Sequence, residues 1–268
     1  MEKITTLGRQ FYAIALLAYG VQFFIYAHSV AQLAPSWPAW LPGQPLPAFV
    51  VGALLIATGL ALLLRRHARV AATLMGSLLL VWIVALNLPL IIANPNDIGA
   101  RNNAAEAFAV CAGAWLAVGA MTHEKITRGT VWATGLAALD RFRPAGRFML
   151  GSALVFFGLE HLQFDTFVAT LVPAWIPAPL FWARFCGVAL MAGGVGIAIR
   201  WPARWPGLLT GLMIFLFGLL VNAPRVSTRL HNPDEWTSLI HTFAWCGAAL
   251  LSAGSPSRRN NSPEDVTP

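Results

Sequence analysis

Charged residues and cysteines are both scarce in this sequence. Asp, Glu, Lys and Arg together make up 11% of the 268 residues, whereas a soluble domain carries roughly a quarter. The three cysteines, Cys111, Cys186 and Cys246, stand alone in apolar runs, without a Cys-x-x-Cys pair. The low charge argues against a soluble enzyme and against a disordered chain. The isolated thiols argue against thiol–disulfide exchange, so we expect buried structural cysteines.

Apolar residues are abundant instead. They account for 57% of the chain, and the mean hydropathy is +0.64. A transmembrane helix needs about 20 mostly apolar residues, and eight segments meet this need. They are Phe11–Ala31, Pro47–Leu64, Val70–Ala93, Ala104–Met121, Phe148–Val168, Leu180–Ile199, Trp205–Ala223 and Trp236–Gly254. The sequence therefore predicts an all-α, multi-pass protein of the cytoplasmic (inner) membrane with eight transmembrane helices.

The distribution of the net charge of +7 predicts how the chain crosses the membrane. Lys and Arg gather near the N-terminus, in the loops after the second, fourth and sixth segments, and in the tail. The opposite side has only Arg101, Arg225 and Arg229, with Arg184 just inside a helix. Under the positive-inside rule both termini face the cytoplasm. No nucleic-acid-binding motif occurs, so we expect the lipid bilayer, and not nucleic acid, as the partner.

The two halves of the sequence match each other at a constant offset of 135 residues. The offset aligns Gly52 with Gly187, Arg65 with Arg200, Arg69 with Arg204, Asn87 with Asn222, Pro89 with Pro224, Cys111 with Cys246 and Gly119 with Gly254. An even number of helices per copy makes the repeats parallel. We therefore predict two four-helix bundles, at 1–121 and 148–254, as a tandem duplication. A basic cytoplasmic linker at 122–147 joins them, and a disordered cytoplasmic tail follows at 255–268.

Several short motifs carry a family resemblance. The second half contains Phe-Gly-Leu-Glu-His at 157–161, Leu-Val-Pro-Ala-Trp-Ile-Pro at 171–177 and Asn-x-Pro at 222–224. The first half has related residues at 26–28, 38–42 and 87–89. Together these resemble the DoxX-like family of four-helix integral membrane proteins. The resemblance implies a membrane subunit associated with thiosulfate:quinone oxidoreduction, or, as in distant relatives, a chaperone or assembly factor.

Polar residues inside the apolar segments are the candidate site residues, because such groups are costly in a membrane. They gather toward the non-cytoplasmic end of each half. In the second half they are Glu160, His161, Asp165, Trp175, Trp182, Arg184, Asn222 and His241, and their first-half counterparts are His28, Gln32, Trp40, Asn87 and Glu106. The spacing of four residues predicts that Asp165 orients the His161 imidazole. A structural role as interfacial anchors and inter-helix hydrogen bonds fits the same residues.

One acid and one base distinguish the second half from the first. Glu160 aligns with Ala27, and Arg184 aligns with Phe49. Because both charges occur in one half only, we predict a Glu160–Arg184 ion pair between the fifth and sixth helices.

Two classes of function fit the sequence. In the first, the chain is a redox-linked accessory subunit that binds a quinone with His161, His241 and Arg184, between walls of Trp175 and Trp182, and works with another membrane or redox subunit. In the second, it is a non-enzymatic chaperone, assembly factor or scaffold. A transporter is a third reading, which the lack of mid-membrane helix breaks disfavours. No metal site or other cofactor site is evident, and whether the chain is catalytic stays open.

Overall fold

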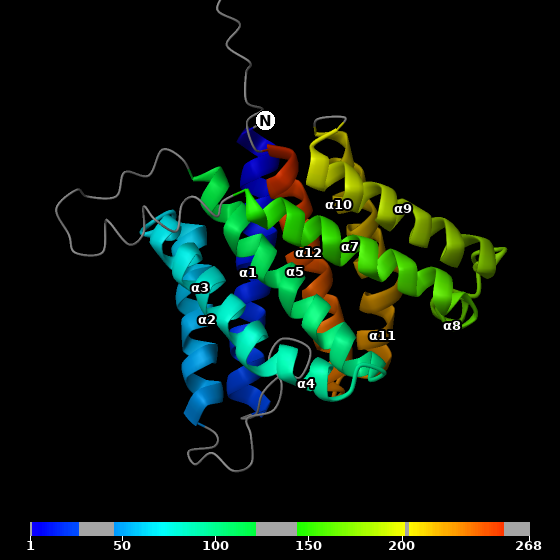
Figure 1. Ribbon diagram of the computed structural model, residues 1–268, viewed down its shortest axis with the longest axis horizontal. Coiled ribbons are helices and arrows are strands. Elements are labelled where there is room, and N and C mark those ends of the chain that lie inside the picture. The colour runs from blue at the N-terminus through cyan, green and yellow to red at the C-terminus, as the bar shows by residue number, and fades with distance from the viewer. Residues whose placement is uncertain (1, 27–45, 122–143, 202–203, 255–268) are drawn as a thin grey trace, which may run out of the picture.

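The computed structural model describes residues 2–26, 46–121, 144–201 and 204–254. Every regular element in these ranges is a helix (Figure 1). The first half contains α1 (Glu2–Tyr26), α2 (Leu46–Leu64), α3 (Ala68–Trp82), η1 (Ile83–Asn87), α4 (Leu88–Ala93) and α5 (Ile98–Ala120). The second half contains α7 (Ala145–Gln163), α8 (Asp165–Leu171), α9 (Pro179–Ile199), α10 (Trp205–Phe217), η3 (Gly218–Asn222), α11 (Ala223–Thr228) and α12 (Pro233–Gly254). The all-helical prediction is confirmed for the described residues.

Five helical stretches in the described residues have the length and composition to cross a membrane. They are Leu46–Leu64, Ala68–Ala93, Ile98–Ala120, Pro179–Ile199 and Trp205–Thr228. The remaining long helices, α1, α7 and α12, are less apolar. Among them, α1 and α12 bury polar side chains such as Gln22, Thr237 and His241 against neighbouring helices. These buried polar residues are compatible with a membrane span, because polar residues of membrane helices normally face the interior of the bundle. The prediction that these three helices also span the membrane stays a prediction.

The third and seventh predicted segments each contain a π-helical stretch. These stretches, η1 and η3, begin 135 residues apart and end at Asn87 and Asn222. Pro89 and Pro224 follow, and a proline inside a helix lacks an N–H and crowds the preceding turn. A wide turn relieves this conflict without ending the helix. The same offset relates Arg65 and Arg200, which end α2 and α9 with φ of 57° and 58°.

Helix packing crosses between the two halves. In the first half α1 packs on α2 and α3 on α5, and in the second half α7 packs on α9 and α10 on α12. However, α1 also packs extensively on α12, and α5 packs on both α7 and α12. A continuous hydrophobic core therefore runs through both halves and includes Tyr12, Leu55, Val110, Leu150 and Leu251.

Close approach of glycines holds the two crossing helices α1 and α12 together. A Cβ on Gly8 would lie 2.9 Å from the carbonyl oxygen of Gly247, and a Cβ on Gly247 would lie 2.6 Å from the Tyr12 nitrogen. Gly254 lies against Thr5, so the start of α1 and the end of α12 are at the same end of the molecule (Figure 1). Small residues allow such close packing between membrane helices.

Among the differences from the predicted boundaries, two concern the fifth segment and the linker. The fifth segment, expected to be continuous over Phe148–Val168, breaks at Phe164, where the backbone leaves helical geometry at φ −115° and ψ 34°. Helix α7 begins inside the predicted linker, because Ala145–Arg147 already belong to it. Residues 122–143 and the predicted tail at 255–268 lie outside the described residues, as do His28, Gln32 and Trp40.

Candidate functional site

A large apolar groove lies between α9 and the α10–η3 helix, with the 172–177 loop at one end. Its volume is about 1520 Å³. Four of the predicted site residues line it, namely His161, Trp175, Trp182 and Asn222. Most of the remaining lining is aliphatic or aromatic, from residues such as Phe217. The other described predicted residues are not part of this lining, namely Asn87, Glu106, Glu160, Asp165, Arg184 and His241.

His161 lines the groove, and one of its ring nitrogens has no hydrogen-bond partner among the described residues. Its Nδ1 lies 2.8 Å from the carbonyl oxygen of Phe157, one turn earlier in α7. A carbonyl only accepts hydrogen bonds, so Nδ1 carries the proton and donates. In the neutral ring Nε2 is then an acceptor. The imidazole also stacks on Phe217, at 6.4 Å between ring centroids and 12° between planes.

The prediction that Asp165 orients His161 is wrong. Asp165 Oδ2 instead accepts a hydrogen bond from Arg184 Nε at 2.7 Å. The helix break at Phe164 explains the difference, because a residue beyond the break no longer continues the face that a regular helix would share at i and i+4. The pair links the first turn of α8 to α9.

The predicted Glu160–Arg184 ion pair is wrong for the same reason. Arg184 is engaged with Asp165, which the break brings within its reach. The polar neighbours of Glu160 include Arg101, Asn102 and Glu106, all on α5. The sequence comparison paired the two charges that are unique to the second half and overlooked a partner from the first half.

Glu106 and His241, which occupy equivalent positions in the two halves, meet where α5 packs on α12. Glu106 Oε2 lies 3.9 Å from His241 Nε2. The other imidazole nitrogen, Nδ1, lies 2.9 Å from the carbonyl oxygen of Thr237 and donates to it. The rings of Tyr19 and Trp245 flank the imidazole, at 5.2 and 5.7 Å between centroids.

The two asparagines before the prolines differ in their surroundings. Asn222 Nδ2 donates to Thr242 Oγ1 at 2.7 Å and to the Ser238 carbonyl oxygen at 3.2 Å, which ties η3 to α12. Asn87 is buried at the equivalent place, and its Nδ2 has no hydrogen-bond partner among the described residues. The Asn222 amide therefore forms hydrogen bonds between helices rather than with backbone groups near Pro224.

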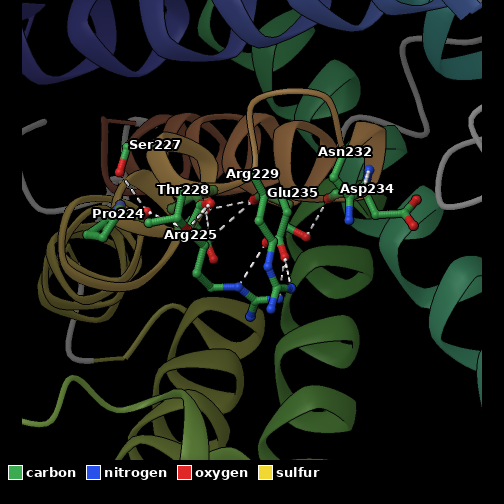
Figure 2. Close-up of polar contacts among 11 residues, drawn as sticks. Pro224, Arg225, Ser227, Thr228, Arg229, Asn232, Asp234 and Glu235 are labelled. Atoms are coloured by element: carbon green, nitrogen blue, oxygen red, sulfur yellow. Dashed lines mark hydrogen bonds and ion pairs between the residues drawn. The ribbon is translucent and has the colours of Figure 1, made fainter.

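A three-residue charged cluster at the start of α12 was not predicted. Arg225 Nε lies 2.8 Å from Glu235 Oε2, and Arg229 Nη1 lies 2.9 Å from Glu235 Oε1 (Figure 2). The Glu235 side chain is only 3% exposed. Hydrogen bonding from Arg225 is the main cause that lowers the pKa of the Glu235 carboxyl. The sequence signal that could have predicted this cluster is the pair Arg225 and Arg229, four residues apart. Glu235 follows them in the same short connection between the seventh and eighth predicted segments.

Comparison of the chain with protein-family models, with curated proteins and with solved structures found no match.

Proposed function

We propose that this protein is a redox-linked accessory protein of the membrane that binds one quinone-type lipid in the groove between α9 and α10–η3. The observation that carries the proposal is the groove itself, about 1520 Å³ of mostly apolar lining with the His161 ring among its few polar groups. Ligand sites typically combine an apolar wall with a small number of placed polar groups. Binding is assigned to this chain, and electron transfer to a partner subunit.

The groove matches the two parts of such a lipid. An isoprenoid tail needs a long apolar wall, which the facing sides of α9 and α10 supply. A hydroxylated ring needs aromatic surfaces and a hydrogen-bond partner, and Trp182, Phe217 and His161 supply these. Because the Nδ1 proton of His161 is used by the Phe157 carbonyl, the free Nε2 accepts from a ligand hydroxyl.

The proposal includes an architecture of eight spans from a tandem duplication, with both termini in the cytoplasm. The equal offsets of η1 and η3, and of Arg65 and Arg200, support the duplication. The contact of Gly254 with Thr5 supports ends on one side of the membrane. The DoxX-like resemblance stays a prediction that is consistent with this architecture.

Quinol titration into the detergent-solubilised protein tests the proposal. A short-chain quinol or quinone should quench the fluorescence of the groove tryptophans Trp175 and Trp182. We expect His161→Ala to weaken binding about threefold to tenfold, the effect of one hydrogen bond. His231→Ala is the matched control, because His231 is exposed and outside the groove.

Two results would contradict the proposal. One is saturable binding that is equal in the wild type and His161→Ala. The other is native mass spectrometry that finds a bound membrane protein and no bound lipid-sized molecule, since this result would favour the chaperone, assembly-factor or scaffold reading instead.

A further inference from the structure

Glu106 and His241 are unusual because each presents a buried polar atom to the other without a hydrogen bond. The facing atoms, Glu106 Oε2 and His241 Nε2, are 3.9 Å apart. Neither atom has a hydrogen-bond partner among the described residues. Leaving a buried polar group unsatisfied costs about 1–3 kcal/mol, and more for a charge. Such a pair of buried atoms between two packed helices therefore needs a physical explanation.

The hydrogen bond of His241 Nδ1 shows that a proton is missing between the two groups. Nδ1 donates to the Thr237 carbonyl, so in the neutral ring Nε2 can only accept. An ionised Glu106 can also only accept. Two acceptors that face each other repel, and a single proton placed between them turns the contact into a hydrogen bond or an ion pair.

We propose that Glu106 and His241 form a binding site for one proton, shared between the two halves of the protein. The proton resides either on the carboxyl of Glu106, which then donates to Nε2, or on Nε2 of His241, which then pairs with the carboxylate. The two forms differ only in the position of that proton. The site lies outside the groove, so it does not depend on the proposed quinone binding.

Three further titratable groups lie around the pair and would interact with the proton. Tyr19 approaches from α1, and its buried hydroxyl has no hydrogen-bond partner among the described residues. Glu160 approaches from α7 as a second acid near Glu106. Arg101 of α5 lies near Glu160 and offsets its charge. Glu160 is half-buried, as is Glu106.

Infrared and nuclear magnetic resonance spectra of the full-length protein in detergent test the proposal together. A carboxyl band that disappears in Glu106→Gln reports a protonated Glu106, and the nitrogen-15 signals of His241 report its tautomer and charge. We expect one of the two residues, and not both, to carry the proton at neutral pH. We also expect Glu106→Gln to move the midpoint of the His241 titration by about one pH unit or more, as for strongly coupled groups.

His241→Gln provides the reciprocal measurement if Glu106→Gln fails to fold, since it should change the Glu106 band. Glu235→Gln is the control, because Glu235 is another acid of α12 that is held by two arginines and is not in contact with Glu106, so it should leave both signals unchanged. An ionised Glu106 beside a neutral His241 at neutral pH would overturn the proposal. The proposal would also be overturned if substitution of either residue left the titration of the other unchanged.

Discussion

Arg184 donates to Asp165 at 2.7 Å and thereby joins the start of α8 to α9. This contact replaces the Glu160–Arg184 pair that the comparison of the two halves predicted. A double-mutant cycle separates the two pairings. We expect Asp165→Ala and Arg184→Ala to be coupled by about 0.2–1 kcal/mol, the range for an exposed pair, because the Arg184 side chain is 59% exposed. The matched cycle of Glu160→Ala with Arg184→Ala should show no coupling in thermal unfolding. Coupling in the second cycle alone would contradict the structure.

The Glu235 cluster predicts a loss of stability in acid. The folded-state pKa of Glu235 is lowered below its ordinary value of 4.5, chiefly by hydrogen bonding from Arg225. Its stabilisation is therefore complete above that value and is lost as the pH falls through the lower, folded-state pKa. Thermal unfolding measured over a series of acidic pH values should show this loss in the wild type and a smaller loss in Glu235→Gln. Asp234→Asn, an exposed neighbour, should behave like the wild type.

The packing of α1 on α12 predicts a severe effect of one methyl group. A Cβ on Gly247 would lie 2.6 Å from the Tyr12 nitrogen and 2.7 Å from the Gly8 carbonyl oxygen. Because these are backbone atoms, Gly247→Ala must push the helices apart, and we expect a loss of roughly 1–3 kcal/mol. Gly119→Ala is the control, since a Cβ there meets nothing within 4 Å. That substitution should be neutral or stabilise α5 by up to about 1 kcal/mol. Equal unfolding temperatures of the two variants would refute the predicted close approach.

The hydrogen-bond direction at His161 predicts a preference between two redox forms of a ligand. A quinol carries hydroxyl groups that donate, whereas a quinone carries carbonyl groups that only accept. Because the free Nε2 of the neutral His161 ring is an acceptor, the quinol should bind about threefold to tenfold more tightly than the quinone. Fluorescence titration of the same protein with the two forms measures the ratio. A preference for the quinone would contradict this assignment, because it would require a proton on Nε2 of His161.

Crossed packing predicts that the two halves need each other. Since α1 packs on α12 and α5 packs on α7, a chain cut between residues 122 and 143 should yield two fragments that co-purify when they are produced together. Each fragment produced alone should accumulate poorly, because it exposes a helix face made for the other half. Affinity capture of a tag on one fragment detects the association. Two fragments that are each stable and do not associate would show that the halves fold independently.

Much of the helical content could be predicted from the sequence, because apolar runs of sufficient length report helices directly. The predicted segment Leu180–Ile199 and the observed α9 end at the same residue, and the predicted start at Trp205 matches that of α10. Local signals were sufficient here, since Arg200 ends one helix and Trp205-Pro206 begins the next. The repeat offset likewise pointed to Asn87 and Asn222, where both π-helical stretches end.

The side-chain pairings could not be predicted in the same way. The expected His161–Asp165 contact assumed an unbroken helix, and no residue type in the 161–165 segment signals the break at Phe164. The neighbours of Glu160 come from α5, more than fifty residues earlier, and no periodicity within one half reports them. The groove depends on how far α9 and α10 diverge, which is a property of packing rather than of sequence pattern. His161 and Asn222 were candidate site residues, but only the structure shows that both line the same groove.

The contact between α1 and α12 also sets the timing of assembly in the cell. The end of α1 and the start of α12 are separated by about 200 residues, which a ribosome translates in about 10–40 s. During that interval one long face of α1, including the tight surface around Gly8, is without its final partner. Any truncated product that ends before Pro233 retains this face uncovered. The part of the core that α1 contributes is therefore closed only after α12 has been made.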